Sequence, residues 1–440
     1  MKRTVALLFL FLCLMLCGCD LYQPDVESLL SAPLLSDLQN HVDDALRDVV
    51  GQDIKLKYPA SGDYRSPYIF FDLDRDGEEE ALVLYSLEND SSITYLQILD
   101  RVDGSWQAGS ALPGSGSEIE FVCFPRLLQS DEITLLIGWQ NADDENYSVS
   151  IYRCSANRLT SIFETTYSQI ALSDFNGDGL EELLIAFADS SSVELRLFAD
   201  NGSGKAEIVD SATASLRMLS LQEPVIGQIS DTLSGVVIDG MVSSSCMASL
   251  LVGVSQSRLI LPQETLSAVD YTQTYRYTGV HSEDINGDGI IEIPVGVQAA
   301  GYTGYNVGDP IIQYFTDYRA FTGTEFRDVI STYENLSSGY RFILPQAFMD
   351  YYRSGELSIY RQAETQEAFF FLYRGSLTER SEELLRLRVV SAADYLDKFD
   401  SERYTLLQKR GQFEYYVYLP TAAEPALTVE EVHRSFSLLN

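Results

Sequence analysis

Histidine is scarce in this chain, and so are the motifs of the common enzyme classes. Only three of the 440 residues are histidine, and His41, His281 and His433 lie in three different segments. None of them belongs to the HExxH pattern of zinc proteases, and the chain has neither a nucleophile-elbow motif nor a phosphate-binding P-loop. The sequence therefore argues against these classes, and we expect a protein that is not an enzyme.

Basic residues are scarce as well. The chain has 30 Lys and Arg against 65 Asp and Glu, which gives a formal net charge of −35 at pH 7. Such a surface repels nucleic acid and anionic lipid head groups and attracts cations, so we expect no nucleic-acid partner. Hydrophobic residues make up 45% of the chain, which is enough to bury a sizeable core.

An apolar run stands at the N-terminus, where the basic start MKR precedes TVALLFLFLCLML. This run has the length of a signal peptide and is short for a transmembrane helix. The next residues, LCGC at 16–19, resemble the lipobox of bacterial lipoproteins. The resemblance implies that residues 1–18 are a signal peptide and that Cys19 carries a lipid. It also implies an anchor on the extracytoplasmic face of a bacterial cell membrane, whereas an ordinary cleaved secretory signal is the alternative.

Cysteine is too scarce to build the fold from disulfides. Once the signal peptide and Cys19 are set aside, only Cys123, Cys154 and Cys246 remain, and an odd number leaves at least one thiol unpaired within the chain. Each of the three lies in or beside a strand-like run. This position indicates buried structural thiols.

The remaining chain divides into regions by its pattern. Residues 19–64 read as a lipidated terminus, a spacer and an amphipathic helix, LLSDLQNHVDDALRDVV, that stops at Gly51. Residues 65–335 contain short strands rich in Val, Ile, Leu, Tyr and Phe, separated by clusters of Gly, Asp, Asn and Ser. We group these strands into five sets of about four, at a period of roughly 50 residues, which is typical of propeller blades.

Residues 336–440 show no such repeat. The segments GYRFILP, EAFFFLYRG, ELLRLRVVS and FEYYVYLP read as strands, and LTVEEVHRSFSLL reads as a closing amphipathic helix with Thr428 as its cap. The pattern predicts a small α+β C-terminal domain.

Three similar acidic nonapeptides interrupt the strands: DLDRDGEEE at 72–80, DFNGDGLEE at 174–182 and DINGDGIIE at 284–292, called here the first, second and third loops. Each offers side-chain oxygens at positions 1, 3, 5 and 9, a main-chain carbonyl at position 7 and a glycine at position 6. Hard oxygens from alternate residues, gathered by a glycine turn, suit calcium. The candidate metal ligands are Asp72, Asp74, Asp76, Glu78, Glu80, Asp174, Asn176, Asp178, Leu180, Glu182, Asp284, Asn286, Asp288, Ile290 and Glu292.

An EF-hand does not explain these loops. It needs a glutamate at position 12, where this chain has Val83, Ile185 and Val295, and it needs flanking helices, whereas strand sequences flank the first loop. The loops resemble instead those of the FG-GAP or VCBS repeats of integrin-like propellers. The resemblance implies a mainly β fold with a β-propeller of four-stranded blades, five of them readable and six or seven possible. The loops start 102 and 110 residues apart, which implies metal in alternate blades.

Up to three calcium ions are therefore expected, and a structural role is favoured over sensing or catalysis. A divalent ion would offset the repulsion among crowded carboxylates and clamp each turn. An ordinary turn rich in Asp and Gly, without metal, is the alternative.

Two functional classes remain open. The first is a membrane-anchored, non-catalytic lipoprotein whose calcium-stabilised propeller is a binding, adhesion or scaffold surface for a protein or glycan. The second is a glycan-processing or sensory enzyme with its site between the propeller and the C-terminal domain. A deep pocket with two carboxylates at glycosidase separation would favour the second class.

Overall fold

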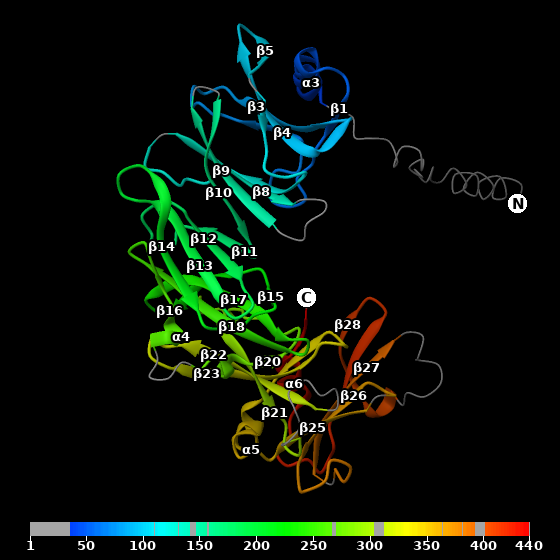
Figure 1. The fold of residues 1–440 in the computed structure, drawn as a ribbon. Helices are drawn as coiled ribbons and strands as arrows, with labels where there is room; N and C mark the ends of the chain where they lie inside the picture. The colour runs from blue at the N-terminus through cyan, green and yellow to red at the C-terminus, as the bar shows by residue number, and fades with distance from the viewer. Residues whose placement is uncertain are drawn as a thin grey trace, which may run out of the picture.

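The structure is a computed structural model that describes residues 36–109, 111–130, 132–140, 147–155, 158–265, 270–302, 312–362, 364–380, 382–391 and 401–439. These residues form a mainly β fold with six antiparallel sheets and a few short helices (Figure 1). The expected signal peptide and Cys19 lie outside the described residues. No helix in the described part of the chain has both the length and the apolar character needed to span a membrane.

The sheets are numbered here in chain order. Sheet 1 contains β1 Ile54–Leu56, β2 Tyr68–Phe71, β3 Glu80–Leu87, β4 Asp90–Val102, β5 Ser105–Ala108 and β6 Leu112–Pro113. Sheet 2 contains β7 Glu118–Cys123, β8 Ile133–Gln140, β9 Tyr147–Ser155 and β10 Arg158–Tyr167. Sheet 3 contains β11 Gln169–Ser173, β12 Glu182–Ala188, β13 Val193–Asp200 and β14 Ala206–Ala214.

The later sheets follow the same scheme. Sheet 4 contains β15 Ser220–Leu221, β16 Val225–Ser230, β17 Leu233–Ser243, β18 Cys246–Ser255, β19 Arg258–Ile260 and β20 Arg276–Tyr277. Sheet 5 contains β21 Ile293–Gln298, β22 Tyr314–Phe321, β23 Phe326–Asn335, β24 Tyr340–Ile343 and β30 Phe436–Leu438. Sheet 6 contains β25 Leu357–Gln362, β26 Glu367–Leu372, β27 Glu383–Ser391, β28 Thr405–Arg410 and β29 Phe413–Tyr418.

The helices are short and lie between or beside the sheets. They are α3 Asp37–Val50, α4 Pro262–Thr265, α5 Met349–Arg353 and α6 Val429–Ser435, with 3-10 turns η1 Tyr271–Thr274, η2 Gln346–Phe348 and η3 Ser401–Arg403.

Consecutive sheets pack face to face, and the two-residue period of the strands explains how. In β12, Leu183 and Ile185 belong to the core shared with sheet 2, whereas Leu184 and Ala186 belong to the core shared with sheet 4. Every pair of consecutive sheets has such a shared core. A central strand must therefore be apolar on both faces, which is why β8 and β18 are buried along nearly their whole length.

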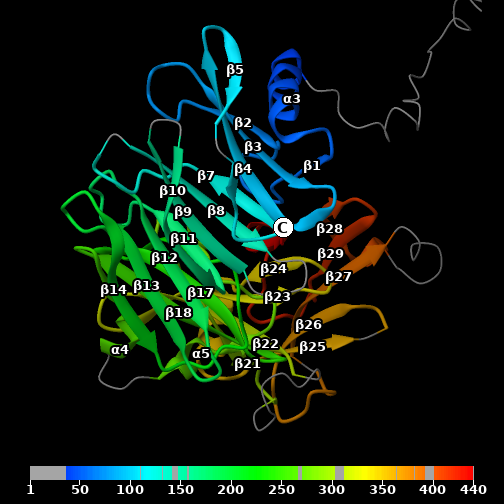
Figure 2. The same cartoon turned by 45° about the horizontal axis from the view of Figure 1, so that its top comes forward.

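The six sheets follow one another along an arc, from sheet 1 in blue and cyan to sheet 6 in orange and red (Figures 1 and 2). Among the described residues, no hydrophobic cluster combines side chains of sheet 1 with side chains of sheet 6. Most strands of sheets 1 to 5 lie between residues 65 and 335, where five strand sets were expected, but β1 precedes this range and β24 and β30 follow it. The contacts show a series of packed sheets, and the closure of this series into a ring of propeller blades stays a prediction.

Helix α3 covers the outer face of sheet 1. Ser36 caps the helix through a capping box with Gln39, and Gly51, the predicted stop, follows it with a φ of 92°. The buried side chains of Val42 and Leu46 pack against apolar side chains of sheet 1. The helix thus occupies the face that a preceding sheet would otherwise cover.

Arginine and aromatic side chains cover the outer face of sheet 6. Tyr360, Phe369, Arg386 and Tyr418 form a row of direct neighbours across β25, β26, β27 and β29. The Arg386 guanidinium carbon lies 4.7 Å from the Phe369 ring centre and 4.9 Å from the Tyr418 ring centre. A guanidinium over a ring shields apolar surface while its polar edge faces water. In the described part of the chain, this layer terminates the series of sheets.

The C-terminal region differs from the sequence prediction. The boundary expected between residues 335 and 336 falls inside sheet 5, because β23 pairs with β24 across it. The closing helix covers only Val429–Ser435, capped by Thr428 as expected, and the next three residues form β30 against β24 instead of further helix. Sheets 5 and 6 share one hydrophobic core. Residues 357–418 therefore continue the series of sheets as its sixth member.

The three cysteines of this region are not joined in disulfides. Cys154 and Cys246 are buried and Cys123 is half-buried, as expected for structural thiols. Burial raises the pKa of Cys123 and Cys154 to about 12, so neither thiol is poised as a nucleophile near neutral pH.

A first prediction concerns helix α3. Leu46→Ala should lower the free energy of unfolding by about 2 to 4 kcal/mol, because the Leu46 side chain is fully buried between the helix and sheet 1. Val49→Ala is the matched control, since Val49 lies one turn away with 62% of its surface exposed. Its effect should stay within about 0.5 kcal/mol. Urea denaturation followed by circular dichroism measures both, and equal effects would contradict the packing role of the helix.

Candidate metal centre

The three acidic loops occupy equivalent places in alternate sheets. The first loop joins β2 to β3 in sheet 1, and the second joins β11 to β12 in sheet 3. The third loop leads into β21 of sheet 5, and a bridge between Glu283 and Glu292 brackets it. In sheet 4 the corresponding turn between β16 and β17 is only Asp231 and Thr232. This placement agrees with the alternation expected from the spacing.

The backbone of each loop follows the same path. At position 6, Gly77, Gly179 and Gly289 have φ values of 94°, 86° and 92°, which side chains with a Cβ rarely adopt. The position 6 N–H donates to the Oδ2 of the position 1 aspartate, with distances of 3.2, 2.9 and 2.9 Å in the first, second and third loops. The loops therefore share one fold as well as one sequence pattern.

The glutamate at position 9 is the buried part of each loop. Glu80, Glu182 and Glu292 are 1%, 2% and 0% exposed. Each carboxylate accepts the N–H of the residue at position 2, at 2.6, 2.9 and 3.0 Å in turn. Burial raises the pKa of each glutamate to about 7, with a further contribution from nearby aspartates. The chain thus places a desolvated carboxyl group at the start of three strands.

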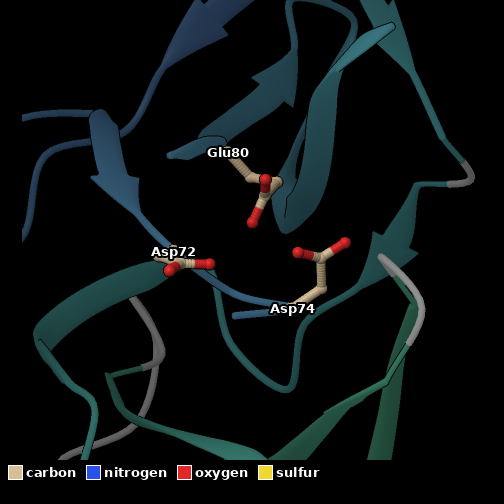
Figure 3. Close-up of side chains that lie close together, drawn as sticks. All are labelled: Asp72, Asp74 and Glu80. Carbon is tan, nitrogen blue, oxygen red and sulfur yellow. The ribbon is translucent and has the colours of Figure 1, made fainter. Parts of the chain in front are cut away.

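In two loops, carboxylate oxygens converge closely enough to hold a metal ion. One oxygen each from Asp72, Asp74 and Glu80 lies within 4.8 Å of the others, and Figure 3 shows these side chains around one space. The second loop brings together Asp174, Asp178 and Glu182 in the same way. A set made only of oxygens fits a hard divalent cation.

The first loop differs from the other two at position 3. There Asp74 stands where the others have asparagine, and Asn176 donates from Nδ2 to a Glu182 oxygen at 2.6 Å. Aspartate cannot make this bond, so the carboxylates of Asp74 and Glu80 meet without a donor between them. The Oδ1 atom of Asp72 is also buried, with no hydrogen-bond partner among the described residues. An unsatisfied acceptor beside repelling carboxylates fits a bound cation.

The third loop is arranged differently, although its sequence matches. Asn286 donates from Nδ2 to Asp288 at 2.9 Å and to Glu292 at 3.2 Å. The Asn286 amide thus stands between the two carboxylates. In the residues that the structure describes, the third loop therefore brings no three acidic oxygens within 4.8 Å of one another.

The other candidate ligands fall into two groups. At position 5, the aspartates accept the N–H of position 7, as in the 2.8 Å bond from Glu78 to Asp76 and the 2.8 Å bond from Leu180 to Asp178. At position 7, Glu78 is exposed, Leu180 is buried and Ile290 is half-buried. The expected ligands at position 7 are the main-chain carbonyls. The burial of the position 7 side chains distinguishes the second and third loops, which face a neighbouring sheet, from the first loop.

Contacts at position 8 are the part of the site that sequence reasoning missed. In the second loop, the Glu181 N–H donates to the carbonyl of Arg126, which follows sheet 2's β7, at 2.8 Å. The Arg126 N–H returns a 2.8 Å bond to the Glu181 carboxylate. In the third loop, the Ile291 N–H donates to the carbonyl of Gln228 in sheet 4 at 2.9 Å. These two loops are thus bonded to the sheet that precedes them.

A buried ion pair fixes the approach to the third loop. Arg276 and Asp239, whose side chains are 0% and 2% exposed, lie 2.7 Å apart. Asp239 also accepts the Ser282 N–H at 2.7 Å, two residues before the loop begins. His281 lies 3.8 Å from the same carboxylate and is half exposed, which gives it no ligand role. Removing one partner of such a pair would leave a buried charge uncompensated.

A groove between sheets 5 and 6 occupies the place where an enzyme site was considered. It has a main cavity of about 810 Å³ and a smaller adjoining cavity of about 300 Å³. Among the described lining residues, the main cavity has no carboxylate and the smaller one has only Glu334. Glu334 is already held by Arg341 at 2.8 Å and by Tyr318 at 2.6 Å. The described lining therefore does not show the carboxylate pair that glycoside hydrolysis requires.

Comparisons with known proteins identify no family for this chain. No protein-family model matches the chain, and no curated protein matches it.

A second prediction follows from the buried glutamates. Their folded-state pKa of about 7 lies above the ordinary value of 4.5, so their contribution to stability is present below pH 4.5 and is lost as pH rises through 7. The metal-free protein should therefore lose about 2 kcal/mol per buried glutamate between pH 5 and pH 8. Thermal melts in EDTA across this range measure the loss.

Glu80→Gln tests the assignment in the first loop, because glutamine cannot ionise. The variant should lose less stability than the native chain between pH 5 and pH 8, whereas Glu78→Gln, at an exposed position of the same loop, should follow the native chain. An unchanged pH dependence in Glu80→Gln would show that this carboxyl group does not titrate in the range.

Proposed function

We propose that this chain is a lipid-anchored, extracytoplasmic bacterial protein whose acidic loops bind Ca²⁺. Its arc of sheets would be a propeller of the FG-GAP or VCBS type, and the whole would act as a non-catalytic binding, adhesion or scaffold surface for a protein or glycan. The observation that carries the proposal is the convergence of Asp72, Asp74 and Glu80 around one space, with a buried oxygen that lacks a partner. The lipid at Cys19 rests on the lipobox resemblance alone.

Calcium suits these loops better than other common cations. The side chains supply only oxygen ligands, without the histidine or cysteine that zinc and copper prefer. Ca²⁺ also accepts irregular sets of six to eight oxygens, including main-chain carbonyls, whereas Mg²⁺ demands a near-ideal octahedron. A nine-residue loop that gathers four side chains and one carbonyl is an irregular set of this kind.

The proposed role of the ion is to clamp the sheets. In the second loop, the candidate ligands Leu180 and Glu182 stand on either side of Glu181, whose N–H is bonded to the preceding sheet. An ion that fixes these neighbours also fixes the intersheet bond between them. Calcium would thus stabilise the packing of one sheet on the next, which suits a structural role better than a sensing role.

The enzyme alternative gains no support from the groove. Its described lining offers one carboxylate, Glu334, and this group is engaged by Arg341 and Tyr318. A binding surface that lacks paired acids is consistent with recognition, and the fold alone does not decide the matter.

A third prediction is calcium binding by the metal-free protein. Isothermal titration of CaCl2 into EDTA-treated residues 19–440 should show saturable binding, with the first and second loops filling before the third. Calcium at ten times the dissociation constant should raise the free energy of unfolding by about 1.4 kcal/mol per independent site, which thermal melts can record. If calcium produces no heat of binding and no shift in melting temperature, the loops are ordinary turns and the prediction is wrong.

Asp74→Asn separates a metal site from a turn. The change copies the asparagine of the other loops and gives Glu80 a donor, so the metal-free protein should be at least as stable as the native chain. Calcium affinity of the first loop should fall, because the loop loses one of its charged ligands. Asp90→Asn is the matched control, since Asp90 is the exposed first residue of β4, accepts the Ser92 N–H, and belongs to none of the three acidic loops. Equal calcium affinity in the native chain and Asp74→Asn would contradict the site.

A further inference from the structure

The groove between sheets 5 and 6 is chemically unlike the rest of the molecule. Acidic residues make up 65 of the 440 residues of the chain, yet none lines the main cavity among the described residues. In the described part of its lining, the one charged side chain is that of Arg410. The neutral polar lining is rich in hydroxyl and amide groups, from Ser337, Ser338, Gln366, Ser391 and Gln412. A ligand that enters this cavity meets hydrogen-bonding groups without a local negative charge.

Apolar side chains are also exposed here. Leu336 and Phe413 are 38% and 41% exposed, and both line the main cavity with Val389 and Tyr415. Large exposed apolar side chains cost free energy unless they contact something, and clusters of them mark ligand sites. The main cavity of about 810 Å³ has the size of an ordinary ligand pocket.

The smaller cavity extends the groove toward sheet 4, and its described lining includes the charged residues Glu334 and Arg361. It shares Leu336 and Ser337 with the main cavity, so the two adjoin. Its aromatic lining includes Tyr277 and Tyr314, whose rings stack with centres 5.3 Å apart. Tyr314 and Tyr415 are buried, so Phe413 in the main cavity is the exposed aromatic side chain of the described lining. A ligand unit with one apolar face and a polar rim fits Phe413 and the hydroxyl and amide groups beside it.

The walls of the groove are fixed by hydrogen bonds. Tyr415 donates from its hydroxyl to the Ser338 carbonyl at 3.0 Å, and Arg361 donates to the Ser337 hydroxyl at 2.8 Å. These bonds tie the turn between β23 and β24 to sheet 6. A preformed site loses less conformational entropy when its ligand binds.

A peptide strand is a poorer occupant than a sugar chain. Peptides commonly bind by adding a strand to an open sheet edge. The edge strands here are β30 in sheet 5 and β28 in sheet 6. Among the described lining residues, none belongs to β30 and only Arg410 belongs to β28, so neither edge faces the cavities along its length. The exposed ring of Phe413 and the neutral polar groups of the main cavity, by contrast, match the apolar face and the hydroxyl rim of a pyranose ring.

We propose that the groove between sheets 5 and 6 binds an uncharged oligosaccharide, with Phe413 as an aromatic platform and Gln412 as a hydrogen-bonding partner. This inference rests on the proposed function as a non-catalytic binding protein, and it names the ligand class and the site. It does not require calcium, because no residue of the three acidic loops lines either cavity.

The test is titration calorimetry of residues 19–440 with three probes: chitotriose, cellotriose and maltotriose. At least one should bind, and Phe413→Ala should weaken that binding about tenfold through loss of the aromatic contact. Gln412→Ala should weaken it as well. Leu406→Ala is the matched control, because Leu406 is similarly exposed at 37% on the same sheet but lies outside the lining. Binding by Leu406→Ala should equal that of the native chain.

Repeating the titration in EDTA and in calcium separates this inference from the metal sites. Equal sugar affinity in both buffers is expected, so a failure of calcium binding leaves the groove test intact. The inference is overturned if none of the three sugars binds at millimolar concentration, or if Phe413→Ala binds the sugar as tightly as the native chain. Circular dichroism of each variant confirms that a loss of binding is not a loss of fold.

Discussion

A sheet in this protein buries its faces by packing on the sheets before and after it, and the rest of the structure depends on that constraint. It explains why central strands such as β8 and β18 are apolar on both faces. It also explains why the described ends of the series need special covers, since a bare end would expose an apolar face to water. Helix α3 covers one end, and the row containing Phe369 and Arg386 covers the other.

Face-to-face packing does not hold together the turns at the ends of the strands, which are called here the rims of the sheets. Core contacts hold the faces, but the turns carry many charges in a chain of net charge −35. Buried carboxyl groups such as Glu80 and Glu182 lie at these rims, where each reduces stability above neutral pH unless a cation offsets its charge. The second and third loops add hydrogen bonds to the preceding sheet through Glu181 and Ile291. The second and third loops thus contain both a buried carboxyl group and a hydrogen bond to the preceding sheet.

The residue at position 7 of each acidic loop differs according to the place of that loop in the series of sheets. The second and third loops have Leu180 and Ile290 at position 7, where the loop faces the preceding sheet. The first loop, at the described start of the series, has the exposed Glu78 instead. Its additional acidic groups agree with a loop that has solvent, and not a neighbouring sheet, on that side. The first loop is accordingly the most negative of the three.

Local features of the fold could be predicted from sequence, because they depend on neighbouring residues. The stop at Gly51, the cap at Thr428 and the five strand sets up to residue 335 are of this kind. Sheet 6 was not recognised as a member of the series, because it has no acidic loop and its strand EAFFFLYRG reads the same in any buried sheet. The bond from Glu181 to Arg126 joins residues 55 positions apart, and no local pattern encodes it.

The candidate site was predictable to the same extent. The oxygen-bearing residues and the glycine turn follow from the loop sequence, and the structure gathers Asp72, Asp74 and Glu80 as expected. The bond from Asn286 to Asp288, which has no counterpart among the bonds of Asn176 in the second loop, depends on side-chain rotamers that a pattern does not specify. The groove between sheets 5 and 6 arises from turns distant in sequence, and residue types alone did not reveal it.

The central claim is that a metal ion in the loops clamps one sheet to the next. Amide hydrogen exchange at Glu181 and Ile291, with calcium and with EDTA, tests it most directly, because these two N–H groups form the intersheet bonds. The account predicts that calcium slows exchange at both amides, while the amide of Leu184, inside sheet 3, changes little. Equal exchange at Glu181 and Ile291 in the two buffers, despite bound calcium, would contradict the clamp.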